Sequence, residues 1–441
     1  MSKQGYKTFA EGGIHPPYNK ELSSDRTIKA APVPAEVTIP LQQNIGAPNA
    51  PLVSAGDKVA VGQKIGETDA FVSAPVHSSV AGTVKAVEEI TNFTGAHVKA
   101  VVIAVDTVQP EFKGEKRDVA SMSPDDIRAA VKEAGIVGMG GAAFPTQVKL
   151  SPPKDKPVDV VLINACECEP FLTCDHRLML ERPGDLVEGL KLLIKAVGAE
   201  KGIIGIEANK MDAIEKVRAA VGSQANLSVE ILEVKYPEGA EKQLISAVTG
   251  RKVPPGKLPS EVGCLVQNVG TAIATYEACS MGKPLYERVM TVTGQGVKNP
   301  GNFLVKIGTP ISALIEAAGG LTDDANKVIM GGPMTGWAQK EFGASVVKGT
   351  SGIVALTPEL VDVRDEVACV RCGKCVEACP MRLIPASIAN SVIDGEYAKA
   401  EMYGAIDCFE CGCCSYVCPA YIPHVTYVRQ AKGKIAALKK R

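Results

Sequence analysis

Eight cysteines near the C-terminal end of the chain occur as two copies of one spacing. Each copy follows C-x2-C-x2-C-x3-C and is followed directly by a proline. The eight residues are Cys369, Cys372, Cys375, Cys379, Cys408, Cys411, Cys414 and Cys418. Two-residue spacers wrap a loop so tightly that three thiolates can bond three irons of one cubane, and the fourth thiolate then comes from the other copy. The spacing therefore predicts two [4Fe–4S] clusters that carry single electrons.

The exchange of the fourth ligand divides the cysteines into two expected sets. The first set is Cys369, Cys372, Cys375 and Cys418. The second set is Cys408, Cys411, Cys414 and Cys379. A zinc site is the alternative. Two CxxC pairs complete the four ligands of such a site, which needs neither the third cysteine of each copy nor the proline. Cys413 is expected to be a bystander, although it could replace a ligand, and Cys264 and Cys279 are expected to be core thiols.

Upstream of the cysteines, four loops offer groups that could hold a cofactor. They are GIVGMGGAAFPT (135–146), NACECEP (164–170), YPEGAE (236–241) and QNVGT (267–271). Three glycines of the first loop let a ligand approach the backbone amides closely, with a bare turn as the alternative. The second loop brings two carboxylates to the end of an apolar strand. In a parallel sheet these loops converge, because ligands bind at the carboxyl ends of the strands.

Apolar runs and amphipathic stretches alternate through this region, as in a mostly parallel sheet with helices on both faces. Strands are expected at 158–165, 201–208, 229–236 and 264–268. Helices are expected at about 123–135, 185–198, 210–221, 240–248 and 271–281. The first helix should begin at Ser123, because Ser123, Pro124 and Asp126 form a capping-box pattern with proline in the first turn.

The remaining residues divide into further modules. Residues 1–30 should form an extended arm, and short alternating strands with glycine turns predict an all-β module at 31–107. That module resembles a biotinyl/lipoyl barrel-sandwich, but no lysine stands near 69–71, where a carrier would be modified, so a structural or docking role is expected. Residues 284–338 resemble a soluble-ligand-binding β-grasp domain, and a purely structural β-grasp is the alternative.

Composition and charge exclude several classes of function. The net charge is −1, which argues against nucleic acid and against general attraction to anionic lipid. No apolar run approaches the roughly 20 residues of a membrane span, and the first residues lack the apolar segment of a signal peptide. These features predict a cytoplasmic chain. In that reducing compartment, the 14 cysteines are expected to be metal ligands or core thiols rather than to form disulfides. The five histidines show no metal-binding spacing and are expected on the surface or in the core.

The loops and the order of modules resemble known families. GMGGAAFPTQVK, NACECEP, YPEGAE and QNVGT resemble the loops of the flavin- and NADH-binding 51-kDa-type subunit of respiratory complex I. Over nearly the whole chain, the order of modules resembles that of the C subunits of Rnf ferredoxin:NAD oxidoreductase complexes. Departures from the complex-I pattern occur at Met139, Gln147, Cys166, Ala240 and Gln267.

The expected fold class is therefore multidomain α/β. It comprises the arm (1–30), the barrel-sandwich β module (31–107), a central α/β FMN/NAD(H) domain with a mostly parallel sheet (120–283), the β-grasp domain (284–338) and an α-helical, ferredoxin-like two-[4Fe–4S] module (360–441). The 28 residues between Cys379 and Cys408 should hold helices that pack the clusters.

The resemblance implies cofactor contacts at matching positions. The implied FMN contacts are Gly138, Gly140, Gly141, Lys149, Asn164, Tyr236, Gly239, Asn268 and Thr271. The implied NAD(H) contacts are Phe144, Glu167, Glu169 and Glu241. An aromatic face can stack on nicotinamide or adenine, and carboxylates can accept hydrogen bonds from ribose hydroxyls. No acid or base is needed, because hydride transfer depends on positioning.

The resemblance also implies a function. The expected protein exchanges a hydride between NAD(H) and FMN, relays single electrons through two [4Fe–4S] clusters, and lies peripherally on the cytoplasmic side of the cell membrane. The implied partners are a ferredoxin-like subunit, integral membrane subunits that move Na⁺ or H⁺, and, indirectly, ferredoxin. Two alternatives stay open: a docking and relay subunit without flavin activity, and the flavin subunit of a soluble NADH-dependent hydrogenase-type complex.

Overall fold

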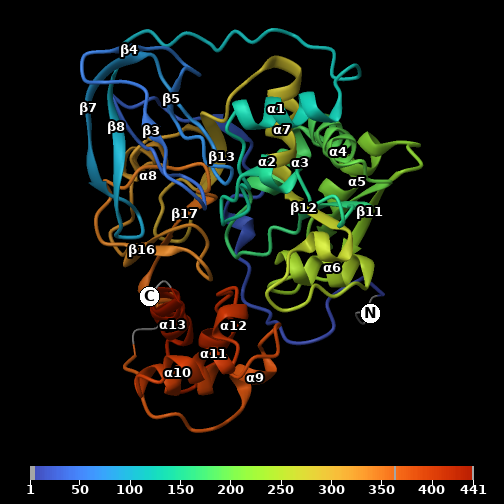
Figure 1. Ribbon diagram of the computed structural model, residues 1–441. Helices are drawn as coiled ribbons and strands as arrows, with labels where there is room; N and C mark the ends of the chain where they lie inside the picture. Colours follow the sequence, from blue (N-terminus) through green and yellow to red (C-terminus); the bar gives the residue numbers. More distant parts are fainter. Residues whose placement is uncertain (1–4, 362–363, 440–441) are drawn as a thin grey trace.

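Four β-sheets and a helical C-terminal module make up the computed structural model, which describes residues 5–361 and 364–439. The N-terminal β module and a six-stranded sheet lie on one side, and the α/β domain lies on the other (Figure 1). The helical module, red in Figure 1, lies across one end of the molecule. The multidomain α/β architecture expected from the sequence is confirmed.

Short strands form the N-terminal module. They are β2 (Glu36–Pro40), β3 (Ala50–Pro51), β4 (Lys58–Val59), β5 (Lys64–Glu67), β6 (Val76–His77), β7 (Gly82–Thr91) and β8 (His97–Val105). One sheet has the order β2-β8-β7-β4 and the other has the order β3-β5-β6. Val37 and Ile39 of β2 and Val101 and Ile103 of β8 are fully buried. Alternation along β2 thus places one face of that sheet against an apolar core.

The N-terminal arm is extended, and it binds three other parts of the chain. It contains the 3-10 helix η1 (Lys20–Leu22) and strand β1 (Ile28–Ala30), which pairs in parallel with β14 (Gly301–Lys306). Ile14 forms a bridge with Tyr236 of the α/β domain. The Gly13 amide donates to the carbonyl of Ala378 in the helical module at 2.9 Å. The arm therefore connects domains that are distant in sequence.

The central domain is built on a four-stranded parallel sheet in the order β11-β10-β9-β12. Its strands are β9 (Val160–Ala165), β10 (Lys201–Glu207), β11 (Leu227–Leu232) and β12 (Cys264–Asn268). Its helices are α1 (Pro124–Glu133), α2 (Thr146–Lys149), α3 (Cys174–Glu181), α4 (Pro183–Val197), α5 (Met211–Val221), α6 (Glu241–Thr249), η2 (Pro259–Val262) and α7 (Val269–Met281).

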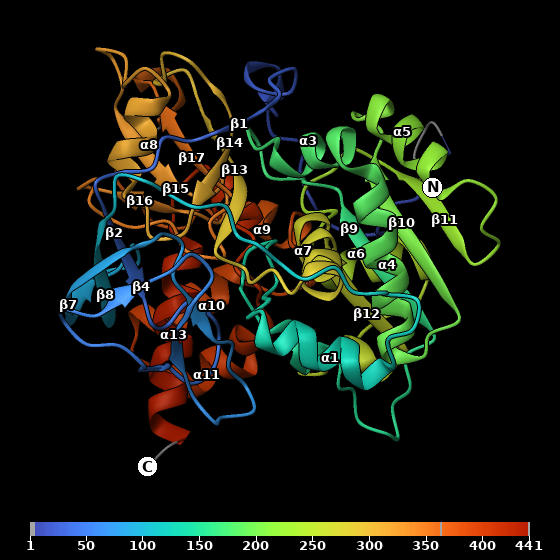
Figure 2. The ribbon, with the colours of Figure 1, turned by 90° about the horizontal axis from the view of Figure 1, so that it is seen from above.

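Side chains of β9 alternate between the two faces of this sheet. Val161 and Ile163 pack into the core that holds α1, α4 and α7, whereas Val160 and Leu162 pack with α6. Figure 2 shows α4 and α7 beside the strands. The predicted capping box of α1 is present, since the Asp126 amide donates to Ser123 Oγ at 3.2 Å and the Ser123 amide donates to Asp126 Oδ2 at 2.8 Å.

The six-stranded sheet has the order β1-β14-β13-β17-β15-β16. Beyond β1 and β14, its elements are β13 (Glu287–Thr293), α8 (Ile311–Ala317), β15 (Lys327–Met330), β16 (Trp337–Gln339) and β17 (Gly352–Leu356), followed by η3 (Pro358–Leu360). The sequence interpretation treated the residues after 338 as a linker. The structure instead places the fully buried β17 inside the sheet, between β13 and β15.

Helices form the C-terminal module. They are α9 (Lys374–Glu377), α10 (Pro385–Ile393), α11 (Tyr397–Met402), η4 (Ala405–Asp407), α12 (Cys413–Tyr416) and α13 (His424–Lys439). Ile388, Val392, Val428 and Ile435 form its apolar core. The expected helices between Cys379 and Cys408 are thus α10 and α11. Among the described residues, no helix is both long enough and apolar enough to cross a membrane.

Candidate functional site

Hydrogen bonds join the four loops in two pairs at the carboxyl edge of the parallel sheet. The Met139 amide of the glycine loop donates to Thr271 Oγ1 at 2.9 Å. Asn164, near the end of β9, donates from Nδ2 to the carbonyl of Gly239 at 2.6 Å. Because β9 and β12 are parallel neighbours, the loops that follow them meet at one edge. The loops converge as the sequence predicts.

The glycine loop presents backbone to open space. The Gly138 amide donates to the carbonyl of Phe144 at 2.9 Å and closes the loop. Gly140 and Gly141 are exposed, and Gly141 has φ +138°, which side-chain-bearing residues rarely adopt. A Cβ at Gly141 would meet no atom within 4 Å. Phe144 is half-buried at the end of the same loop. This backbone can therefore approach a ligand closely.

Asn268 and Thr271 hold the glycine loop against the start of α7. Asn268 Oδ1 accepts from the amides of Gly270 and Thr271 and so caps the helix. Thr271 Oγ1 also donates to the carbonyl of Val137 at 3.2 Å. From β13, Arg288 reaches the carbonyl of Met139 at 3.4 Å. The two side chains implied to contact FMN thus have protein partners that fix the shape of the loop.

A close approach explains why Gly239 stands opposite Asn164. A Cβ at Gly239 would lie 3.1 Å from Asn164 Oδ1 and 3.2 Å from Cys168 Sγ. At the end of α2, Lys149 Nζ pairs with Glu241 Oε1 of α6 at 2.6 Å and donates to the carbonyl of Val266 at 3.1 Å. One predicted FMN contact and one predicted NAD(H) contact are therefore an ion pair in this structure.

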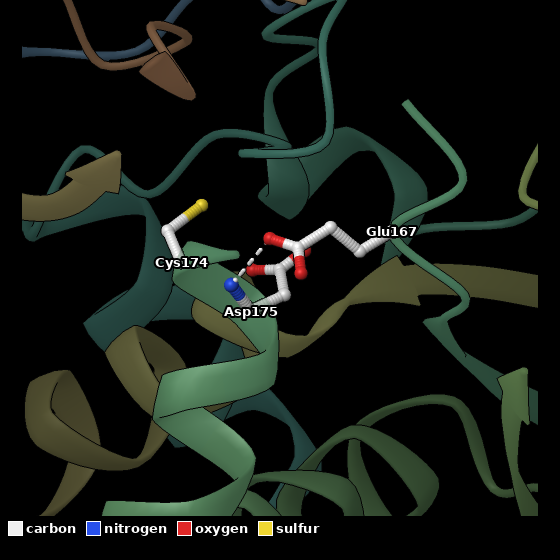
Figure 3. Close-up of side chains that lie close together, drawn as sticks. All are labelled: Glu167, Cys174 and Asp175. Carbon is white, nitrogen blue, oxygen red and sulfur yellow. Dashed lines mark hydrogen bonds between the residues drawn. The ribbon is translucent and has the colours of Figure 1, made fainter. Parts of the chain in front are cut away.

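Glu167 caps the N-terminus of α3. Its Oε1 accepts from the Asp175 amide at 2.7 Å (Figure 3). Its Oε2 accepts from the His176 amide at 3.2 Å. Glu167, Cys174 and Asp175 bring ligand-type atoms within 4.8 Å of one another. Burial and the neighbouring Glu167 raise the pKa of Asp175 to about 7. Burial also holds the pKa of the Cys174 thiol well above its usual value, so this cysteine stays a thiol.

Asp175 connects this acidic group to the α7 cap. Asn268 Nδ2 donates to Asp175 Oδ2 at 2.6 Å, and the Asp175 side chain is buried. The position of Asn268, and through it the glycine loop, therefore depends on Asp175. The sequence interpretation missed both Asp175 and helix α3.

Glu169 links the loop after β9, called the acidic loop because it carries Glu167 and Glu169, to the six-stranded sheet. Its carboxylate accepts from the Met334 amide at 3.1 Å and from the Thr335 hydroxyl. Burial raises the pKa of this carboxyl. A Cβ at Gly332 would lie 2.3 Å from Glu169 Oε2, so a larger residue there would displace the Glu169 side chain from its hydrogen bonds. Glu169, a predicted NAD(H) contact, thus also joins two domains.

Two buried lysines donate hydrogen bonds to backbone carbonyl groups in and next to the acidic loop. Lys20 Nζ from the arm donates to the carbonyls of Glu167, Glu169 and Leu172 at 2.8, 3.0 and 2.6 Å. Lys210 Nζ donates to the carbonyl of Cys166 at 2.6 Å. Burial lowers the pKa of Lys20, and the nearby Lys210 lowers it further. The ammonium groups fix the direction of successive peptide groups in this loop.

Tyr236 reaches from the α/β domain to the cysteine module. Its ring is buried, and its hydroxyl donates to the carbonyl of Cys411 at 2.8 Å. A Cβ at Gly412 would lie 2.9 Å from the carbonyl oxygen of Met334, which shows close packing against the segment that Glu169 binds. The side chain of Tyr236, implied to contact FMN, is therefore directed to a cysteine loop.

The two cysteine loops share one backbone conformation. Left-handed residues occur at the same three offsets in each copy: before the second cysteine, after it, and three residues after the fourth. In the first copy they are Arg371, Gly373 and Arg382, and in the second copy they are Glu410, Gly412 and Tyr421. The repeat seen in the spacing is therefore also a repeat of the fold.

Each predicted cysteine set surrounds one cavity. The first cavity is lined by Cys369, Cys372, Cys375 and Cys418. The second cavity is lined by Cys379, Cys408, Cys411 and Cys414, together with Cys413. All these cysteines are free thiols. Four thiols around one cavity fit the ligand set of a [4Fe–4S] cluster, and cluster ligation remains a prediction.

Four domain families match the chain in the order expected. Residues 7–108 match the RnfC barrel sandwich hybrid domain, and residues 131–277 match the Nuo51 FMN-binding domain. Residues 289–338 match the SLBB domain, and residues 368–422 match the 4Fe-4S dicluster domain.

Curated relatives match over almost the whole chain. The chain is 47% identical to the C subunit of the Na(+)-translocating ferredoxin:NAD(+) oxidoreductase complex of Acetobacterium woodii, over 98% of both chains. It is 43% identical to the C subunit of the proton-translocating complex of Clostridium ljungdahlii, over 99% of this chain and 95% of the relative. It is 38% identical to the C subunit of the ion-translocating oxidoreductase complex of Rhodobacter capsulatus, over 98% and 84%. The chain therefore belongs to the family of C subunits of ion-translocating ferredoxin:NAD(+) oxidoreductase (Rnf) complexes.

Proposed function

We propose that this chain is the NAD(H)-reactive, electron-relaying subunit of a membrane-bound, ion-translocating ferredoxin:NAD(+) oxidoreductase. Bound FMN supplies the exchange between a hydride and single electrons, because a flavin can take or give electrons in either form. The observation that carries the proposal is a direct contact between the two sites. Tyr236, in one of the four loops of the proposed FMN site, bonds to Cys411 of the second cysteine set. A flavin site and an iron–sulfur site that touch can exchange electrons within one chain.

The glycine loop and the strand ends form the proposed FMN site. The exposed backbone at Gly140 and Gly141 offers amides to the cofactor, and Asn268 and Thr271 hold that backbone in place. Proposed NAD(H) contacts are Phe144, Glu167, Glu169 and Glu241. Since both Glu167 oxygens already accept from α3, Glu167 contributes mainly by fixing the shape of the loop.

The two cysteine sets have distinct places in the proposed relay. The second set contacts the α/β domain through Cys411, and Gly12 of the arm packs against the carbonyl of Cys379. The first set includes the exposed Cys372, and Val370 and Val376 beside it are exposed as well. We assign the second set to exchange with FMN and the first set to exchange with a partner.

The proposed partner carries an iron–sulfur centre of its own and docks over the first set. Integral membrane subunits of the same complex would then hold this chain at the cytoplasmic face of the membrane. The observation favouring this arrangement is the exposed apolar rim around Cys372, because apolar surface next to a redox centre suits a short transfer distance and a dry contact.

Cofactor content and NADH reactivity test the proposed function. The full chain, purified without oxygen and reconstituted with iron, sulfide and FMN, should retain about one FMN and about eight irons. NADH should then bleach both the flavin and the cluster absorbance. Retention of the irons without flavin, and no bleaching by NADH, would establish the docking and relay alternative instead.

Membrane attachment separates the two enzyme alternatives. Cells that express a tagged chain together with the other subunits of its complex should yield it in the membrane fraction, with integral membrane proteins bound to it. Recovery of an NADH-reactive, FMN-loaded complex only from the soluble fraction would instead favour the soluble hydrogenase-type assembly.

A further inference from the structure

The two cysteine cavities differ in the side chains that complete their walls. Apart from the cysteines, the second cavity is lined by apolar groups such as Met381, Leu383 and Val428. The first cavity is lined in addition by the polar residues Arg371, Ser387, Asn390 and His424. Because the two loops share one backbone conformation, backbone amides surround both cavities in a similar way. The side chains are therefore the principal difference between the two sites.

Positions equivalent in the internal repeat show this difference directly. Helix α10 begins at Pro385, six residues after Cys379, and helix α13 begins at His424, six residues after Cys418. His424 lines the first cavity. Pro385, at the same offset in the other copy, lines the second cavity and has no N–H donor. An imidazole thus faces one site where a proline faces the other.

His424 is the most telling of these polar residues. It is the first residue of α13, is 1% exposed, and lines the first cavity. Neither ring nitrogen makes a hydrogen bond of normal geometry within the described residues, and the backbone of Pro385 only partly offsets the effect of burial on the pKa of the ring. Burial lowers the pKa of this histidine, so the ring is neutral and keeps one N–H donor. A buried donor without a partner costs free energy unless a group absent from the chain accepts its hydrogen bond.

The sulfurs of a cluster in the first cavity would be such acceptors. Reduction of a [4Fe–4S] centre adds one electron and no proton, so the reduced cluster carries one more negative charge. An N–H donor stabilises that charge, and hydrogen bonds to sulfur together with solvent exposure are what the protein uses to set the reduction potential. Cys372 of the first set is exposed, whereas Cys411 and Cys414 of the second set are buried. The N–H donor and the greater solvent exposure both shift the reduction potential of the cluster in the first cavity to a more positive value.

We propose that the two clusters are electrochemically unequal, that the cluster of the first set has the more positive reduction potential, and that His424 is the residue that positions a donor to raise it. This inference rests on the proposed function, because it needs both cysteine sets to hold clusters. Under this proposal, the first electron taken up by the chain resides on the cluster of the first set, which faces the partner.

An anaerobic redox titration of the full reconstituted chain, followed by electron paramagnetic resonance, tests the proposal. The wild type should show two separate one-electron steps. His424→Leu, which keeps an apolar volume and loses the N–H, should move the more positive step to a more negative potential and leave the other step in place. His424→Gln, whose amide retains a donor, should keep the step closer to its wild-type potential.

Removing the first set identifies the steps without relying on His424. A Cys369→Ala/Cys372→Ala double variant should keep only the more negative step; survival of the more positive step would overturn the proposal. An unchanged titration of His424→Leu with wild-type iron content would also overturn it. A wild-type chain that binds no clusters would instead contradict the proposed function, so the two failures are distinguishable.

Discussion

The hydroxyl of Tyr236 donates a hydrogen bond to the backbone carbonyl of Cys411 at 2.8 Å. The two residues are 175 positions apart, and their contact joins the loop after β11 to the second cysteine set. The same junction is closed by the arm, where the Gly13 amide donates to Ala378. The route between the proposed flavin and cluster sites is therefore a buried protein contact and not a gap filled by solvent.

Tyr236→Phe should weaken this junction. The substitution leaves a buried carbonyl without its donor, which costs roughly 1 to 3 kcal/mol. FMN and iron content should stay near the wild-type values, while stopped-flow mixing with NADH should show slower cluster bleaching after unchanged flavin bleaching.

Tyr427→Phe is the matched control, because it removes a tyrosine hydroxyl that bonds to Glu366 within the cysteine module and does not join that module to the α/β domain. Equal rates of cluster bleaching in Tyr236→Phe and the wild type would show that the contact has no part in electron exchange.

Lys20→Met should disorder the acidic loop. The ammonium group donates to three carbonyls of residues 167–172, and Met keeps the volume but no donor. We expect a loss of about 3 kcal/mol in unfolding free energy, together with weaker FMN retention and a raised KM for NADH.

Lys29→Met, in the same arm, is the control, because Lys29 is exposed. Denaturant unfolding and flavin retention should separate the two variants. If both behave like the wild type, the proposal that the arm positions the flavin loop is wrong.

Local patterns explain which parts of the fold could be predicted. The cysteine grouping follows from ligands a few residues apart, and α4, α5 and α7 follow from long apolar or amphipathic runs. The short helix α3 and the buried strand β17 were missed because neither has a long periodic pattern. Lys20 could not have been found from the sequence, since its first acceptor lies 147 positions away and the arm around it is polar.

The predicted site residues illustrate the same limit. Motif resemblance located the loops, and the structure brings Asn164, Gly239, Asn268 and Thr271 together at the sheet edge. Motif resemblance could not reveal that the side chain of Tyr236 bonds to the cysteine module, because that contact depends on how two domains pack.

Gly239→Ala should impair FMN binding by crowding. The added Cβ would lie 3.1 Å from Asn164 Oδ1 and 3.2 Å from Cys168 Sγ, so these side chains must move by a few tenths of an ångström. Overpacking of this kind costs about 1 to 3 kcal/mol. Fluorescence titration with FMN measures the change in Kd. Gly184→Ala, where a Cβ meets no atom within 4 Å, is the control and should bind FMN normally. Wild-type affinity in Gly239→Ala would show that the loop tolerates the shift.

Asp175→Asn should remove a pH dependence of stability. Burial and Glu167 raise the pKa of Asp175 to about 7, from an ordinary value of about 4 in the unfolded chain. Because the folded pKa is raised, the contribution of this group to stability is complete below about pH 4 and is lost as the pH rises through 7. The slope for one such group is at most about 1.4 kcal/mol per pH unit.

The wild type should therefore lose stability relative to Asp175→Asn between about pH 4 and pH 7, with little further change above pH 7, as measured by urea unfolding. The asparagine can still accept from Asn268 Nδ2, so the α7 cap should remain intact. Parallel stability curves for the two proteins would show that Asp175 does not titrate in this range.

Cys372→Ala should lower the iron content of the reconstituted chain from about eight to about four. Cys372 lines the first cavity, and the second cavity takes no ligand from that residue, so the second cluster should persist with its own paramagnetic signal. Cys264→Ala is the matched control, because Cys264 is a buried thiol at the opposite, amino-terminal end of β12 and lines neither cavity. It should retain all the iron. Full iron content in Cys372→Ala would mean that Cys372 is not a ligand, and loss of all iron with a folded α/β domain would mean that the two sets do not form independent sites.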